Sequence, residues 1–168
     1  MPDPLDLDFD PIRRAAEIWR DRFGPAEAMA AATSVMRVQQ LLLGEFDRIC
    51  RPYGLTFARY EALVLLTFSR TGALPMAKIG ERLMVHPTSV TNTIRRLEAA
   101  GFVTREPNPE DGRGTLARVT RQGREVVDKV TGELMAADFG LRALDDAERN
   151  RLFDLLREVR LAARDFRE

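Results

Sequence analysis

The stretch His86-Pro-Thr-Ser-Val-Thr-Asn-Thr-Ile-Arg-Arg-Leu-Glu-Ala-Ala-Gly101 decides the fold, because it contains the start, the apolar stripe and the end of a helix. Pro87 suits the first helical position, where the missing N–H costs nothing. Gly101 suits the left-handed position that closes the last turn. The apolar stripe recurs at i, i+4 and i+7 and consists of Val90, Ile94 and Leu97.

The opposite face of this helix is short, polar and cationic. Its members and their flanking positions are Thr88, Ser89, Thr91, Asn92, Arg95 and Arg96. Small hydroxyl and amide side chains allow a helix to approach a duplex closely, and an arginine can fork onto a guanine or a phosphate. The pattern therefore predicts a recognition helix for the major groove of double-stranded DNA.

The stretch just before this helix completes a helix-turn-helix. Residues 75–85 predict a short helix, with Ile79 and Leu83 at i and i+4, and this helix ends at the turn before Pro87. A short helix, a tight turn and a second helix that enters the major groove is the helix-turn-helix arrangement.

The stretch after the recognition helix predicts a β-hairpin, or wing. Residues 102–107 and 115–120 have the pattern of strands, and residues 108–114 between them are turn formers. Arg113 near the tip can reach into a narrow minor groove, where the negative potential is deepest. Asp111 can orient Arg113 or pair with an arginine of the helix, although an Asp-Gly pair is also a simple hairpin turn.

Residues 75–123 resemble the winged helix-turn-helix of the MarR family of bacterial transcription regulators. The most specific parts are Leu97-Glu-Ala-Ala-Gly-Phe-Val103, Asp111-Gly-Arg113 and Thr120-Arg-Gln-Gly123, in this order and at this spacing. The resemblance implies a mainly α-helical fold with a small β-hairpin wing, in which the first and last helices of two protomers intertwine into a homodimer. It also implies that Asp111 ties the wing to the helix and that Arg113 enters the minor groove.

The function implied is a sequence-specific transcriptional regulator, more often a repressor than an activator, that binds a pseudo-palindromic operator and is released by a small-molecule effector. The residues expected to face base edges are Thr88, Ser89, Thr91, Asn92 and Arg95, after Pro87 at the helix start. Those expected to meet phosphates are Lys78, His86, Arg96 and Arg105. Many family members carry arginine where this chain has Asn92 and an acid where it has Arg95, so the preferred base sequence stays open.

The overall charge gives no support to nucleic-acid binding, because 26 Lys and Arg balance 26 Asp and Glu. Residues 86–121, however, hold six arginines and four acids, and affinity follows the local field over the phosphates. The alternative is a winged helix that binds a protein and not DNA. The arginines disfavour this alternative, because a protein interface would favour aromatic residues on the helix face.

Few residues suit catalysis or metal binding. A metal site needs several ligands, so one histidine and one cysteine predict neither a metal site nor an intramolecular disulfide. His86 suits an N-cap or a phosphate contact, and Cys50 suits a packed position better than a redox-sensing thiol. With no nucleophile beside a base, we expect neither an enzyme nor a cofactor. Without an apolar run of about 18 residues or a signal peptide, we expect a cytoplasmic protein with no membrane partner.

The chain divides into three expected parts. Residues 1–24 form an arm and an extra helix, residues 25–55 and 121–168 a helical dimerisation region, and residues 56–120 the DNA-binding region. The expected helix caps are Asp10, Thr56, Thr120 and the capping box at Asp145 and Glu148. In the last helix, a spacing of 4, 3, 4, 3 predicts a seam for another helix, made of Leu152, Leu156, Val159, Ala163 and Phe166.

The extra helix carries the single tryptophan, for which two interpretations are open. Trp19 and Phe23 can pack this helix onto the core, or Trp19 can form a wall of a ligand pocket. An extra N-terminal helix with a tryptophan resembles the urate-responsive branch of the family, in which the tryptophan contributes to the effector site. We therefore predict an effector pocket formed by Trp19, Tyr60 and Glu61, for an organic anion or an aromatic molecule that the sequence does not identify.

Overall fold

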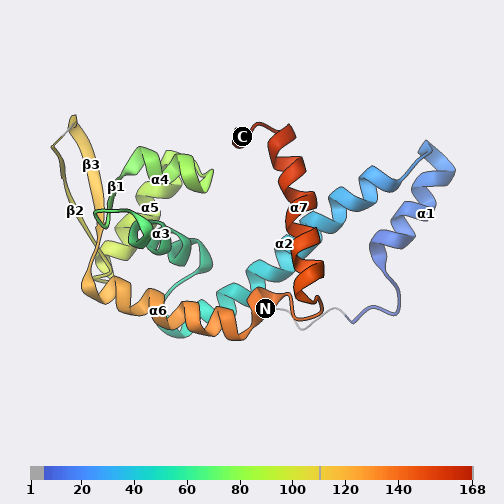
Figure 1. The fold of residues 1–168 in the computed structure, drawn as a ribbon, viewed down its shortest axis with the longest axis horizontal. Helices are drawn as coiled ribbons and strands as arrows, with labels where there is room; N and C mark the ends of the chain where they lie inside the picture. Colours follow the sequence, from blue (N-terminus) through green and yellow to red (C-terminus); the bar gives the residue numbers. More distant parts are fainter. Residues whose placement is uncertain (1–5, 110, 168) are drawn as a thin grey trace.

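The computed structural model describes residues 6–109 and 111–167, and it describes no side chains for residues 111–113. In this part the chain is mainly α-helical, as predicted (Figure 1). The α-helices are α1 (Pro11–Phe23), α2 (Glu27–Cys50), α3 (Phe57–Phe68), α4 (Met76–Leu83), α5 (Pro87–Ala99), α6 (Arg121–Ala136) and α7 (Asp146–Ala162). Two short 3₁₀ helices are η1 (Arg51–Tyr53) and η2 (Asp138–Gly140).

The wing belongs to a small antiparallel sheet with the strand order β1-β3-β2. The strands are β1 (Ala73–Pro75), β2 (Val103–Asn108) and β3 (Asp111–Val119), so the predicted hairpin is confirmed and its second strand is longer than expected. Sequence analysis missed β1, because three residues are too few to show the alternation typical of a strand. By pairing with the base of β3, β1 joins the wing to the helix-turn-helix.

The hydrophobic core lies where α3, α5, α6 and the sheet meet. The predicted stripe of α5 is confirmed, because Val90, Ile94 and Leu97 are between 0% and 2% exposed. Leu63 of α3 and Val130 of α6 are also completely buried. Burial of this face fixes the rotation of α5 and turns its polar face outward.

Most of the expected caps are confirmed. Asp10 accepts from the N–H of Ile12 at 2.9 Å, and the Thr120 hydroxyl accepts from the N–H of Gly123 at 3.0 Å. Asp145 and Glu148 form the reciprocal capping box that opens α7. These side chains satisfy N–H groups that have no partner within a helix.

Thr56 is the N-cap residue of α3, as predicted, but its side chain does not close the helix end. Thr56 makes no side-chain cap hydrogen bond. The first amide of α3, from Phe57, instead donates to a carboxylate oxygen of Asp47 on α2, at 2.7 Å. A carboxylate is a stronger acceptor than a hydroxyl and complements the positive end of the helix dipole. A side chain of the long helix α2 therefore closes the start of α3.

Two tyrosine hydroxyls also contact side chains of α6. The Tyr60 hydroxyl on α3 lies 2.8 Å from the Thr131 hydroxyl on α6. The Tyr53 hydroxyl in η1 donates to the Glu133 carboxylate, and this hydrogen bond raises the pKa of Tyr53. Together with the shared core, these contacts attach α6 to η1 and to α3.

A single chain leaves much apolar surface exposed on α1, α2 and α7, which lie away from the wing (Figure 1). The interpretation that Trp19 and Phe23 pack α1 onto the core is wrong, because these side chains are 39% and 71% exposed. Their rings pack against each other, with centroids 4.9 Å apart. In the predicted seam of α7, Val159 is 67% exposed. Among the described residues, no helix is long and apolar enough to cross a membrane.

Candidate nucleic-acid interface

The recognition helix begins at Pro87, which takes the first helical position as predicted. Before it, the His86 ring accepts from the N–H of Thr88 through Nδ1, at 3.2 Å. This confirms His86 as the N-cap of α5, and its contact with a phosphate stays a prediction. The cap and the proline set the start of the helix.

A close approach between two helices fixes the turn before α5. Met84 adopts a left-handed conformation with φ 53° and ψ 40°, and the N–H of Val85 then donates to the carbonyl of Gly80 at 3.0 Å. A Cβ on Gly80 would lie 3.1 Å from the Val85 carbonyl oxygen and 3.2 Å from a methyl group of Val90. Glycine at this position therefore lets α4 and α5 pack closely against each other.

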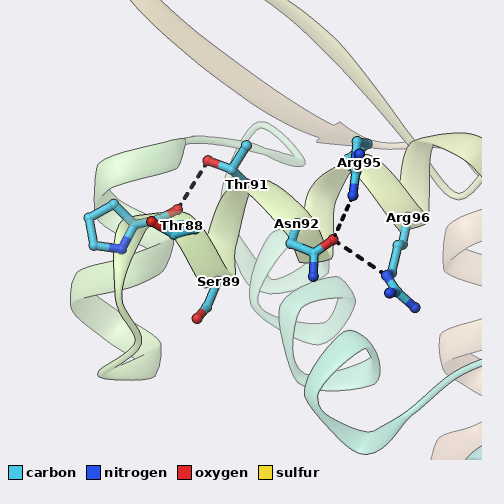
Figure 2. Close-up of a pocket in the computed structure, with 7 residues that line it drawn as sticks. Thr88, Ser89, Thr91, Asn92, Arg95 and Arg96 are labelled. Carbon is cyan, nitrogen blue, oxygen red and sulfur yellow. Dashed lines mark hydrogen bonds between the residues drawn. The ribbon is translucent and has the colours of Figure 1, made fainter.

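The exposed face of α5 forms an open groove of about 760 Å³ (Figure 2). Its lining consists of Pro87, Thr88, Ser89, Thr91, Asn92, Arg95 and Arg96. These are the residues of α5 that the sequence placed at the helix start and on its polar, cationic face, which is called the reading face below. The structure brings them together on one exposed surface, with hydroxyl, amide and guanidinium groups in a row.

Hydrogen bonds within the groove already occupy some of these groups. Asn92 accepts through Oδ1 from Arg95 Nη2 at 3.0 Å and from Arg96 Nε at 3.4 Å (Figure 2). The Thr91 hydroxyl donates to the carbonyl of Pro87 at 3.0 Å. Thr91 thus directs its hydroxyl toward the backbone, while the two guanidinium groups converge on one amide oxygen.

Arg105, expected to meet a phosphate, forms an ion pair within the protein. Its Nη2 lies 2.6 Å from a carboxylate oxygen of Glu98, near the end of α5. This contact raises the pKa of the Arg105 guanidinium. Sequence analysis missed Glu98 because the two residues come together only after the chain turns at Gly101. The pair ties the wing to the recognition helix and offsets one positive charge.

A second ion pair braces the base of the wing. Arg118 Nη2 lies 2.6 Å from a carboxylate oxygen of Glu106, and Arg118 Nη1 donates to the carbonyl of Thr71 at 2.8 Å. The guanidinium lowers the pKa of the Glu106 carboxyl. Sequence analysis counted Arg118 only as a positive charge, yet the antiparallel pairing of two adjacent strands was a usable signal for this contact.

Among the described side chains of residues 86–121, the positive charge that no carboxylate offsets therefore lies on α5. Arg105, Arg118 and Arg121 each pair with a carboxylate. Within the described side chains, Arg95 and Arg96 contact no carboxylate, and both are exposed. Lys78 of α4 is exposed as well.

The wing tip carries the remaining predicted residues. Asp111 begins β3 and is paired with Asn108 of β2, across an irregularity in the register. The side chains of Asp111 and Arg113 lie outside the described residues. Their predicted roles in tying the wing to α5 and reading the minor groove stay predictions.

Comparison with known proteins assigns the family. The model of the MarR family matches residues 58–115, which include α5 and most of the wing. The HTH-type transcriptional repressor Rv2887 of Mycobacterium tuberculosis is 30% identical over 122 residues, which cover 73% of this chain and 86% of the relative. The chain belongs to the MarR family.

Solved structures confirm the winged-helix fold of this MarR-family protein. Sco5413, a MarR family transcriptional regulator from Streptomyces coelicolor, is 63% identical, with a TM-score of 0.79 over 84% of this chain and 99% of that chain. Sco3205 from the same organism, solved in complex with DNA, is 26% identical, with a TM-score of 0.74 over 82% of this chain and 88% of that chain. The likeness of α1 to the urate-responsive branch stays a prediction.

The residues predicted for an effector pocket do not meet in a single chain of the MarR-family protein. Glu61 lines a pocket of about 580 Å³ between α2, α3 and α7, and partial burial raises the pKa of its carboxyl. Tyr60 is buried, with its hydroxyl held by Thr131, and does not line this pocket. Trp19 lies on α1, at the other end of α2 from α3 (Figure 1).

Cys50 has the properties of a packed side chain. It is 0% exposed, and burial, with a smaller contribution from the charge of Asp47, raises the pKa of its thiol to about 11. The reactive thiolate is thus disfavoured near neutral pH, which supports the structural interpretation of Cys50. Among the described residues, no three His, Cys, Asp or Glu side chains gather in a way that could hold a metal ion.

Proposed function

We propose that this MarR-family protein is a sequence-specific, double-stranded-DNA-binding transcriptional regulator that acts as a repressor and binds a pseudo-palindromic operator as a homodimer. The observation that carries this proposal is the exposed face of α5. Its apolar stripe is buried, and the opposite face gathers seven polar or helix-starting residues in one groove beside the wing. A helix presented in this way fits the major groove.

The comparisons support the proposal. The mycobacterial relative is named a transcriptional repressor, and Sco3205 was solved with DNA. In this chain, base edges would be contacted by Thr88, Ser89, Thr91 and Arg95. Phosphates would be contacted by Lys78, His86 and Arg96, and by Arg105 once Glu98 releases it. Arg113 would reach the minor groove.

The exposed apolar surface supports a homodimer. Val35, Met36 and Leu41 of α2 are between 49% and 59% exposed, and Leu155 and Val159 of α7 are 68% and 67% exposed. A second copy that covers these helices would remove this surface from water. It would also place two recognition helices one turn of DNA apart, as a pseudo-palindrome requires.

The pocket between α2, α3 and α7 supports release by a small molecule. Its lining is mostly aliphatic and aromatic, and the polar members are Ser34, Gln39 and Glu61. This chemistry fits an aromatic molecule better than an organic anion, because an anion would face the Glu61 carboxylate. A ligand here would act by changing the distance between the two recognition helices, which shifts the population between DNA-fitting and non-fitting states.

Duplex binding at several salt concentrations tests the proposed function. The probe is DNA from the protein's own upstream region, and a scrambled duplex of the same composition is the control. We expect selective binding to the upstream duplex. The logarithm of the association constant should fall linearly with the logarithm of the salt concentration, with a slope of about −0.9 for each phosphate contacted. Equal, weak binding to both duplexes would reject the proposal and favour a module that binds a protein partner.

Glu98→Gln should strengthen DNA binding. The substitution replaces the Glu98 carboxylate, 2.6 Å from Arg105, by a neutral amide, which holds the guanidinium less strongly than a phosphate attracts it. One added contact per protomer should raise duplex affinity about threefold to tenfold at low salt. The slope of the logarithm of the association constant against the logarithm of the salt concentration should become steeper by about 0.9 per contact. Titration of both duplexes measures the change.

Glu125→Gln is the matched control for this prediction. It breaks the ion pair with Arg121 on α6, where the two side chains are 2.8 Å apart. Duplex affinity should stay close to that of the unmodified protein. Equal gains for the two variants would show that the effect comes from net charge and not from the released Arg105.

A further inference from the structure

The side-chain oxygen of Asn92 on the recognition helix accepts hydrogen bonds from two arginines. Arg95 and Arg96 follow it by three and four residues, so all three side chains lie on one face of α5. Arg95 Nη2 is 3.0 Å from Asn92 Oδ1, and Arg96 Nε is 3.4 Å from the same atom (Figure 2). One amide oxygen has two lone pairs, so these two bonds fill its acceptor capacity.

This arrangement limits what Asn92 can read in a duplex. An asparagine recognises adenine by donating to N7 and accepting from the N6 amino group. With Oδ1 occupied, Asn92 keeps only the two N–H donors of its amide. The side chain therefore cannot make the two-bond contact with adenine unless it first gives up both arginines.

The arginines keep most of their donors. A guanidinium has five N–H groups, and the contact with Asn92 uses one on each side chain. Guanine offers two acceptors, N7 and O6, to the major groove, and arginine forks onto this pair. The central part of the reading face thus presents donors from all three side chains, which matches guanine and mismatches the N6 amino group of adenine.

We propose that Asn92 is a positioning residue that holds the Arg95 and Arg96 guanidinium groups through Oδ1, so that Arg95 reads a guanine in each half of the operator. This inference rests on the proposed function. For the same surface, it names the base that is read and separates the residue that reads it, Arg95, from the residue that positions the reader, Asn92. Holding a long cationic side chain in place before binding reduces the side-chain entropy lost on association. Asn92 acts on affinity through the arginines and not by its own contact with a base.

The test begins with selection of the preferred duplex from a random pool by the full-length protein. Each half-site guanine is then replaced by 7-deazaguanine, which lacks the N7 acceptor. We expect the unmodified protein to lose about tenfold in affinity on this replacement, the order of discrimination that one arginine–guanine pair supplies. Asn92→Ala should bind the selected duplex about fivefold to tenfold more weakly and lose much less on the same replacement.

Asn92→Asp separates positioning from simple loss of a side chain. A carboxylate still accepts from both arginines but has no N–H donors, so the ratio of affinities for guanine and 7-deazaguanine duplexes should stay near that of the unmodified protein. Gln122→Ala, which removes an exposed amide from α6, is the control and should change neither the affinity nor the ratio. Asn92 is exposed, and alanine favours a helix, so thermal unfolding should show that Asn92→Ala stays folded.

Two results would overturn the inference while the proposed function stands. One is an unchanged guanine to 7-deazaguanine ratio in Asn92→Ala. The other is a half-site adenine whose replacement by 7-deazaadenine weakens the unmodified protein but not Asn92→Ala, since Asn92 would then read adenine itself. A different result, in which the unmodified protein selects no sequence at all, rejects the proposed function and the inference with it.

Discussion

Replacing both Arg95 and Arg96 by alanine should lower affinity for the selected duplex at least a hundredfold. These arginines stand exposed on the reading face, and no carboxylate of the described side chains offsets their charge. A dimer would lose two contacts in each half-site, and one bidentate base contact alone is worth about 1–3 kcal/mol. The association constant should also depend less steeply on the salt concentration, because a phosphate contact is lost with Arg96.

The control is Arg13→Ala with Arg14→Ala, a pair of exposed neighbours on α1. This double variant removes the same charge from a helix that lies far from α5 (Figure 1). Titration of the selected and scrambled duplexes should show nearly unchanged selectivity. If both double variants bound alike, net charge and not the surface of α5 would govern DNA binding.

The second large effect concerns Gly123, near the start of α6. A Cβ at this position would overlap the carbonyl oxygen of Phe102 and lie 2.9 Å from a methyl group of Val119. Both neighbours belong to the base of the wing, and a backbone carbonyl cannot move aside as a flexible side chain can. Gly123→Ala should therefore reduce the free energy of unfolding by about 1–3 kcal/mol, the usual cost of overpacking.

Gly132→Ala in the same helix provides the opposite case. A Cβ there meets no atom within 4 Å, so the higher helix propensity of alanine should raise the free energy of unfolding by about 0.5–1 kcal/mol. Denaturant unfolding of both variants, at one fixed protein concentration, measures the expected loss of stability in Gly123→Ala and the expected gain in Gly132→Ala. A stabilised Gly123→Ala would show that α6 can shift away from the wing without cost.

Several elements of the fold could be predicted because their signals are local. The proline start and apolar stripe of α5 give the helix and its buried face, and the turn formers at 108–114 give the hairpin. Contacts between segments that lie far apart in the chain have no comparable local pattern in the sequence. The Asp47 cap on Phe57 and the third strand at residues 73–75 depend on the packed structure, so sequence analysis missed them.

The sequence predicted where the candidate site lies, but not which hydrogen bonds its side chains form with one another. Helical periodicity placed the polar residues between Thr88 and Arg96 on one face, and the structure gathers them in one groove. The i, i+3 and i, i+4 spacing from Asn92 to the arginines was also visible, but its meaning depends on which rotamers the side chains adopt. An amphipathic pattern likewise shows that α1 has an apolar face and does not say what covers it, which is why Phe23 was placed wrongly.

The Asp47 cap has a consequence for how this protein can be divided. The first amide of α3 is closed by a carboxylate of α2, and the Tyr60 hydroxyl of α3 is held by Thr131 of α6. A piece comprising residues 56–120 alone would carry an unfinished helix end and lose the hydroxyl partner of Tyr60. We therefore expect this piece to be less stable on its own than the same residues are within the whole chain.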